Sequence, residues 1–146
     1  MLGVSLLSVT LMTLGLTSPA SAAYRITDDR GGQIGRYVDT FASLRTSGET
    51  VMIDGLCLSA CTMVLGLVPR ERICVTQHAR LGFHAAWRPD QNGNQVRSDM
   101  GTRFLWAVYP PRVRNWLQRK GGLSRQMVFL QGRELTAMYP TCRAGL

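Results

Sequence analysis

The chain has 146 residues and a formal net charge of +8, with 17 basic residues against nine acidic ones. This length suits one domain with one hydrophobic core and excludes a large multidomain protein. The basic surface would favour anionic partners, such as weak contacts with anionic components of a cell envelope, although a merely arginine-rich surface has the same composition. Because the arginines do not cluster beside aromatic residues, we expect no nucleic-acid partner.

The first 22 residues have the pattern of a secretory signal peptide. Residues 2–16 are apolar and uncharged, and residues 20–22 (Ala-Ser-Ala) form a small-x-small cleavage signature. No basic residue precedes the run, which suggests that the true start lies upstream. An uncleaved anchor helix is the alternative, although the run is short for a span of roughly 20 residues. We therefore predict a leader at 1–22, a domain at 23–146 and a periplasmic or secreted location.

Hydrophobic periodicity in the rest of the chain predicts alternating strands and helices. Strands are expected at residues 24–27, 50–53, 72–75 and 80–84, and helices at residues 34–44, 60–67, 100–109, 113–119 and 124–130. Residues 55–58 are expected to form a turn and residues 87–99 a polar loop, long enough to be a lid, while residues 135–139 fit no element clearly. This alternation favours an α/β fold of parallel strands with helices packed on them.

Ser59, at a predicted strand-to-helix junction, is a candidate nucleophile, and His84, at the end of a predicted strand, is a candidate base. A serine hydroxyl needs a base to accept its proton and donors to stabilise the oxyanion. The free N–H of Ala60 at the helix start, and an N–H of the Gly31-Gly32 turn, could be those donors. Each feature also has an ordinary explanation: a helix cap, a packed histidine and a simple turn.

The chain has four cysteines, Cys57, Cys61, Cys74 and Cys142. In an exported chain an even number of cysteines predicts two disulfides, whose pairing the sequence leaves open. A zinc site is the weaker alternative, because there is no C-x-x-C pair and there are only two histidines, so we expect no metal and no cofactor. Cys57 or Cys61 could also be a thiol nucleophile, but we favour a disulfide that pins the Ser59 turn to Cys74 or Cys142. These cysteines replace both glycines of a G-x-S-x-G elbow, which argues against an α/β-hydrolase.

The stretch from 24 to 88 resembles the proteolytic subunit of the Clp protease, in the crotonase-like superfamily. It is more similar still to small exported bacterial proteins described as periplasmic and Clp-protease-like. In that family a Gly-Gly turn closes a strand, a serine nucleophile begins a helix, and a later strand ends in Ala-Arg-x-x-x-His. Here Asp-Arg-Gly-Gly stands at 29–32, Ser59 follows, and Ala-Arg-Leu-Gly-Phe-His stands at 79–84.

This resemblance implies a crotonase- or Clp-protease-like fold of repeated β-α-β units with parallel strands, whose N-terminal strands are missing. It implies Ser59 as nucleophile, His84 as base, and Ala60 with a glycine of the 31–32 turn as oxyanion donors. A peptide or other acyl substrate and a homo-oligomer belong to the same expectation.

The third catalytic group departs from the family pattern. The family has an aspartate at the place of residues 127–130, where this chain has no carboxylate. Asp54, Asp90, Asp99 or a backbone carbonyl could orient the histidine instead. We therefore hypothesise a periplasmic serine hydrolase, a peptidase. The alternatives are a catalytically inactive crotonase-like binding or assembly module of the cell envelope, and an anion-binding envelope protein.

Overall fold

The structure is a computed structural model that describes residues 23–143. The predicted leader at 1–22 lies outside the described residues. The described chain forms a mixed α/β fold built on a mostly parallel sheet. Among residues 23–143, none of the helices is long and apolar enough to cross a membrane.

The main sheet has five strands, and its order is β1-β2-β4-β7, with β3 alongside the first half of β2. Strands β1, β2, β3 and β4 run parallel, whereas β7 runs antiparallel to β4. Their bounds are β1 Tyr24–Asp29, β2 Val51–Leu58, β3 Ile73–Val75, β4 Arg80–Phe83 and β7 Val128–Gln131. The first strand sits at an edge, and only Ile26 of its side chains is buried.

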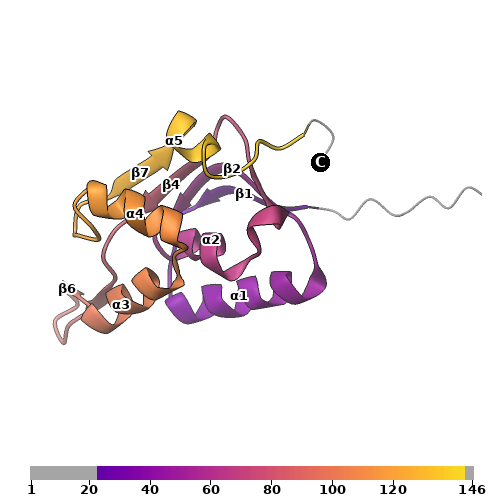
Figure 1. Cartoon of the computed structure of the whole chain (residues 1–146). Coiled ribbons are helices and arrows are strands. Elements are labelled where there is room, and N and C mark those ends of the chain that lie inside the picture. The colour runs from indigo at the N-terminus through magenta and orange to yellow at the C-terminus, as the bar shows by residue number, and fades with distance from the viewer. Residues whose placement is uncertain (1–22, 144–146) are drawn as a thin grey trace, which may run out of the picture.

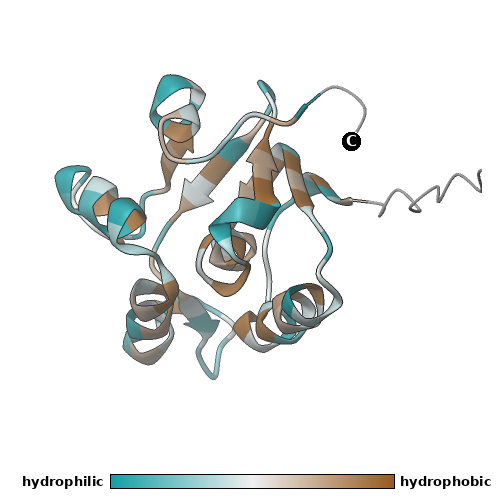
Figure 2. Ribbon diagram, turned by 45° about the vertical axis from the view of Figure 1, so that its right-hand side comes forward, coloured by the Kyte–Doolittle hydropathy of each residue, from teal (hydrophilic) through white to brown (hydrophobic). Residues whose placement is uncertain are grey.

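The helices gather mainly on one side of the sheet (Figure 1). Their bounds are α1 Ile34–Ser47, α2 Val64–Leu67, α3 Asp99–Val108, α4 Pro111–Arg119 and α5 Gly132–Thr136, with two 3-10 turns, η1 Ser59–Met63 and η2 Arg70–Arg72. Figure 2 shows the apolar faces of the helices turned inward toward the sheet. The largest fully buried side chains come from both layers and include Trp116, Tyr109, Phe41 and Phe83.

The helix η1–α2 is apolar on most sides because it lies within this core. Ala60, Cys61 and Val64 are each 1% exposed or less. At Gly66 an added Cβ would lie 1.8 Å from the carbonyl oxygen of Val108, so only glycine lets α3 pass this closely. The helix that begins at Ser59 is therefore buried in the core and packed closely against the end of α3.

Three expectations about secondary structure are wrong. Residues 55–58 continue the strand β2 and do not form a turn. Residues 128–131 form the strand β7, where a helix was expected over 124–130. Here the exposed edge of β4 offers backbone partners to a short β-branched and aromatic segment, and a short isolated helix could not compensate for losing them. The segment 87–99 holds an antiparallel hairpin, β5 Trp87–Pro89 with β6 Gln95–Arg97.

Candidate active site

Ser59 sits in a strained turn between a strand and a helix. β2 ends at Leu58 and the 3-10 turn η1 begins at Ser59. The φ angle of Ser59 is 56°, and no other residue except glycine has a positive φ within 23–143. A non-glycine residue in this region costs of order 1 kcal/mol or more and persists only when its surroundings hold it there. Such outliers concentrate at functional sites, and a sharp strand-to-helix turn is one way to present a serine hydroxyl.

The Gly31 backbone lies directly against this turn. A Cβ added at Gly31, whose φ is 81°, would lie 2.6 Å from the carbonyl oxygen of Leu58 and 2.7 Å from Cβ of Ser59. It would also come within 3.2 Å of the backbone nitrogen of Ala60. Gly31 is therefore required both for its backbone angle and for the room it leaves beside Ser59.

Asp29 and Tyr37 fix the shape of the glycine turn, and neither was expected from the sequence to belong to the site. The Gly31 N–H donates to Oδ1 of Asp29 at 2.8 Å, and the Tyr37 hydroxyl donates to the same oxygen at 2.5 Å. Burial, together with this bond to the carboxylate, raises the pKa of Tyr37 well above its ordinary value, so Tyr37 stays a donor. The Asp-x-Gly spacing, typical of an Asx turn, was the available signal.

The hydrogen bond from Gly31 to Asp29 makes the two glycines differ as candidate oxyanion donors. The Gly31 N–H is already used by Asp29. The Gly32 N–H has no hydrogen-bond partner among the described residues. At the other side of Ser59, Ala60 is the second residue of η1, where backbone N–H groups have no partner within the helix. Gly32 and Ala60 are thus the candidates with free donors.

A buried polar pair supports the Ser59 turn from below. The Thr62 hydroxyl lies 2.6 Å from the carbonyl oxygen of Ser59, to which it donates. The same hydroxyl lies 2.7 Å from the hydroxyl of Tyr109, which is 1% exposed. Burial raises the pKa of Tyr109 to about 12, so it remains protonated at neutral pH. The carbonyl of the strained residue is therefore held in place by the core.

The disulfides are Cys57–Cys61 and Cys74–Cys142. The expectation of two disulfides is confirmed, but the expected link from the Ser59 turn to Cys74 or Cys142 is wrong. The cysteines flanking Ser59 bond to each other, with their Cα atoms 5.3 Å apart, because the turn at Ser59 brings the strand end back against η1. With both thiols in this bond, neither Cys57 nor Cys61 can be a nucleophile.

Ser59 and His84 line one groove of about 710 Å³. The glycine turn and Ala60 lie at the same groove, and the remaining wall comes mainly from α1, the β5–β6 hairpin and α3, through Ile34, Trp87, Pro89, Ser98, Gly101 and Leu105. The structure therefore gathers the five proposed site residues at one place. No hydrogen bond joins the Ser59 hydroxyl to the His84 ring within 23–143, and such bonds are often long when no substrate is bound.

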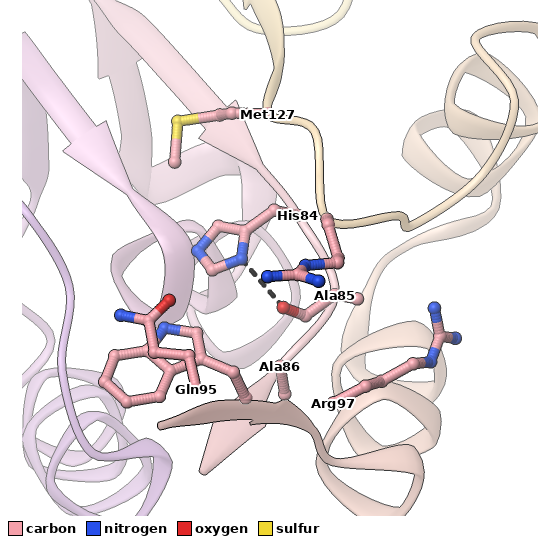
Figure 3. Close-up of a pocket in the computed structure, with 8 residues that line it drawn as sticks. His84, Ala85, Ala86, Gln95, Arg97 and Met127 are labelled. Atoms are coloured by element: carbon pink, nitrogen blue, oxygen red, sulfur yellow. Dashed lines mark hydrogen bonds between the residues drawn. The ribbon is translucent and has the colours of Figure 1, made fainter. Parts of the chain in front are cut away.

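His84 follows β4 directly, and its ring is oriented by its own chain. Nδ1 lies 2.7 Å from the carbonyl oxygen of Ala85, shown as a dashed line in Figure 3. A carbonyl oxygen can only accept, so Nδ1 carries the proton and the neutral ring has its lone pair on Nε2. This is the tautomer that a serine base requires, and here a backbone carbonyl selects it in place of the carboxylate of a Ser-His-Asp triad.

The three aspartates considered as substitutes are engaged elsewhere. Asp54 bonds to Arg25, Thr76 and His78. Asp90 accepts the N–H groups of Asn92 and Asn94 inside the hairpin turn. Asp99 pairs with Arg97 at 2.9 Å. None of these three aspartates forms a hydrogen bond with His84. Of the expected substitutes for the third catalytic group, the one that contacts His84 is a backbone carbonyl, that of Ala85.

Neither protein-family models nor curated proteins match the chain. Among solved structures, the chain is similar to an asparagine-to-aspartate mutant of ClpP1 from Listeria monocytogenes. The identity is 14% and the TM-score 0.42, over 80% of this chain and 71% of that chain. A likeness at this level defines no family for this chain and assigns no role to its residues. Within 23–143, no three His, Cys, Asp or Glu side chains are arranged to hold a metal ion.

Proposed function

We propose that the chain is an exported serine hydrolase, a peptidase related in fold to the Clp protease, with Ser59 as nucleophile and His84 as base. The observation that carries this proposal is the joint placement of two unusual groups at one groove. Ser59 is held at a φ of 56°, and the Nδ1 atom of His84 is bonded to a carbonyl, which leaves Nε2 as proton acceptor. The two disulfides suit an oxidising compartment, so we further propose that residues 1–22 direct export.

In this mechanism Oγ of Ser59 attacks the carbonyl carbon of an acyl substrate while Nε2 of His84 takes the hydroxyl proton. The imidazolium then gives that proton to the leaving group, the scissile bond breaks, and an acyl ester forms on Ser59. Water repeats the sequence: its oxygen bonds to the acyl carbon, the ester bond breaks, and the proton returns to Oγ. Water is the only co-reactant that this sequence of steps consumes.

Backbone amides would stabilise the negative charge on the carbonyl oxygen. The amides of Gly32 and Ala60 are the available donors beside Ser59, since Asp29 occupies that of Gly31. Removal of one such donor typically costs a factor of about 100 to 1,000 in turnover. Asp29 and Tyr37 would act through the shape of the glycine turn, as positioning residues.

One observation favours a second candidate, an inactive binding module with the same fold. No carboxylate contacts His84 among the described residues, and a carbonyl stabilises an imidazolium less than a carboxylate does. In that case the groove would bind a ligand without turning it over.

Treatment of the purified protein, with its disulfides intact, with a fluorophosphonate probe separates the two candidates. We expect one phosphonyl adduct per chain, located on Ser59 by peptide mass spectrometry, and no adduct on Ser59→Ala. Ser98→Ala is the matched control, because Ser98 lines the same groove but caps α3. A folded wild-type protein that stays unlabelled would reject the hydrolase and favour the binding module.

A further inference from the structure

A second, smaller pocket adjoins the groove and shares His84 with it. It has a volume of about 160 Å³ and is lined by His84, Ala85, Ala86, Trp87, Gln95, Arg97, Arg125 and Met127. Three of these residues, His84, Ala86 and Trp87, also line the larger groove, whereas Ser59 and the glycine turn do not line this pocket. A cavity of roughly 150 Å³ holds a molecule the size of benzene, so this pocket has room for one small chemical group or residue.

The lining of this pocket is positively charged and contains no carboxylate. Its two arginines differ in their engagement. Arg97 is committed to the protein: its Nε donates to Asp99 at 2.9 Å and its Nη1 donates to the carbonyl oxygen of Leu123 at 3.3 Å. Figure 3 accordingly shows the Arg97 side chain extending away from the imidazole.

Arg125 is the arginine of this pocket whose guanidinium is available to a ligand. Within the described part of the chain its guanidinium makes no hydrogen bond and no ion pair, although it lines the pocket. A guanidinium presents two parallel N–H groups that match a carboxylate. The amide of Gln95, which lines the same pocket as His84, adds a neutral donor to this space. The pocket therefore has the chemistry of an anion subsite.

The position of the small pocket next to His84 indicates which part of a substrate would enter this pocket. In serine hydrolysis the base delivers its proton to the leaving group, so the leaving group must lie on the imidazole side of the scissile bond. The small pocket shares His84 with the groove but is not lined by Ser59, so it adjoins the base and not the nucleophile. A group bound there would belong to the leaving fragment.

We infer that this pocket binds an anionic group of the leaving fragment, with Arg125 as its main partner. The favoured substrates are then short acyl-peptides whose free C-terminal carboxylate lies within one or two residues of the scissile bond. The inference rests on the proposed function for its assignment to the leaving group, but the anion subsite itself does not require catalysis. Arg125 would determine specificity and would take no part in the proton transfers.

The test compares two pools of acetylated tetrapeptides that differ only at the C-terminus, one with a free carboxylate and one amidated. Release of new amino groups is measured for the wild type, Arg125→Gln and the control Arg133→Gln, whose exposed arginine on α5 lines neither pocket. We expect the wild type and Arg133→Gln to cleave the carboxylate pool about 10- to 100-fold faster than the amide pool. Arg125→Gln should reduce that ratio to near one. A wild-type ratio near one, or an equal loss on both pools in Arg125→Gln, would overturn the subsite.

A binding measurement keeps the two proposals distinguishable. Ser59→Ala protein is titrated with acetyl-triglycine and with its amide by NMR. Shifts at Ala85 and Gln95 that appear only with the carboxylate, and that are lost in the Ser59→Ala, Arg125→Gln double variant, support the subsite even if no hydrolysis is found. Equal binding of both probes, or binding that does not depend on Arg125, rejects the subsite even if the hydrolase proposal holds.

Discussion

The two histidines of this chain sit in opposite surroundings. His78 has the partner that a catalytic histidine usually has: its Nδ1 lies 3.2 Å from Oδ1 of Asp54, and the Thr76 hydroxyl lies 2.5 Å from the same oxygen. Within residues 23–143, the His84 ring bonds only to the carbonyl of Ala85. Yet His84 lines a groove with Ser59, whereas the His78 side chain is 66% exposed and lines neither pocket described above.

The contrast shows that a hydroxyl, an imidazole and a carboxylate in contact do not make a site. In the His78 cluster Thr76 donates to Asp54 and faces no imidazole nitrogen, so the hydroxyl has no base to activate it. This cluster ties β2 to Arg25 on β1 and to the turn before β4. In the His84 site, by contrast, the hydroxyl is held in a strained turn beside free backbone donors. Enclosure and backbone strain separate the two regions more clearly than their side-chain lists do.

The largest expected effect is on the rate of fluorophosphonate labelling, and it distinguishes the two histidines. His84→Gln should slow the reaction of Ser59 with a fluorophosphonate by about 100- to 10,000-fold, since no base remains to take the hydroxyl proton. His78→Gln is the matched control and should stay within about twofold of the wild type, because the ring has no contact with the groove. Labelling kinetics by intact-protein mass spectrometry measure both. An equal effect of His84→Gln and His78→Gln on the labelling rate would contradict the proposed difference between the two histidine regions.

The two disulfides are also expected to differ in their effect on the labelling of Ser59. This effect should be smaller than that of His84→Gln. Cys57→Ala, Cys61→Ala removes the cross-link that spans Ser59, so the strained φ can relax and the labelling rate should fall about tenfold. Cys74→Ala, Cys142→Ala opens a loop of sequence separation 68 rather than four, so it should cost more stability, about 4 against about 2 kcal/mol in the chain-entropy model. Its labelling rate should be close to wild type. Urea unfolding and labelling of both double variants give the two readouts.

A reversed result, in which loss of the distant disulfide slows labelling more than loss of the local one, would show that Ser59 depends on global rather than local constraint.

The smallest effect concerns the His78 region alone. Hydrogen bonds from Thr76, Arg25 and His78, in that order of size, hold the pKa of Asp54 well below its usual range. A carboxylate with a lowered folded-state pKa stabilises the fold above its unfolded pKa of about 3.9, and this contribution fades as the pH falls toward the folded value. Asp54→Asn should therefore lower Tm at pH 7, and by less at pH 3.

Thermal unfolding of Asp54→Asn and wild type at the two pH values measures this difference. Labelling by the fluorophosphonate should not change at pH 7. A loss of labelling without a change in Tm would show that the His78 cluster affects the groove. The two histidine regions would then not be functionally distinct.

Local sequence predicted the parts of the site that depend on neighbouring residues. The β-branched run before Ser59, the small apolar residues after it and the glycine pair placed a serine at a strand-to-helix junction near a flexible turn. The strands at Tyr24–Asp29 and Arg80–Phe83 and the helix at Ile34–Ser47 also follow from periodicity, apart from their ends. These features are set by spacing of two or 3.6 residues, which the chain itself displays.

Only the tertiary structure decided the features that depend on residues distant in sequence or on a single torsion angle. Which cysteines pair, which glycine amide is free and which group orients His84 depend on the groups that the fold brings into contact. Residues 128–131 became a strand because β4 had an open edge, although their own pattern allowed a helix. The sequence alone determined that Ser59 and His84 deserve testing together, because each ends or follows a strand of one parallel sheet. Their shared groove exists because packing of α1, the hairpin and α3 encloses that edge, and no local pattern encodes such an enclosure.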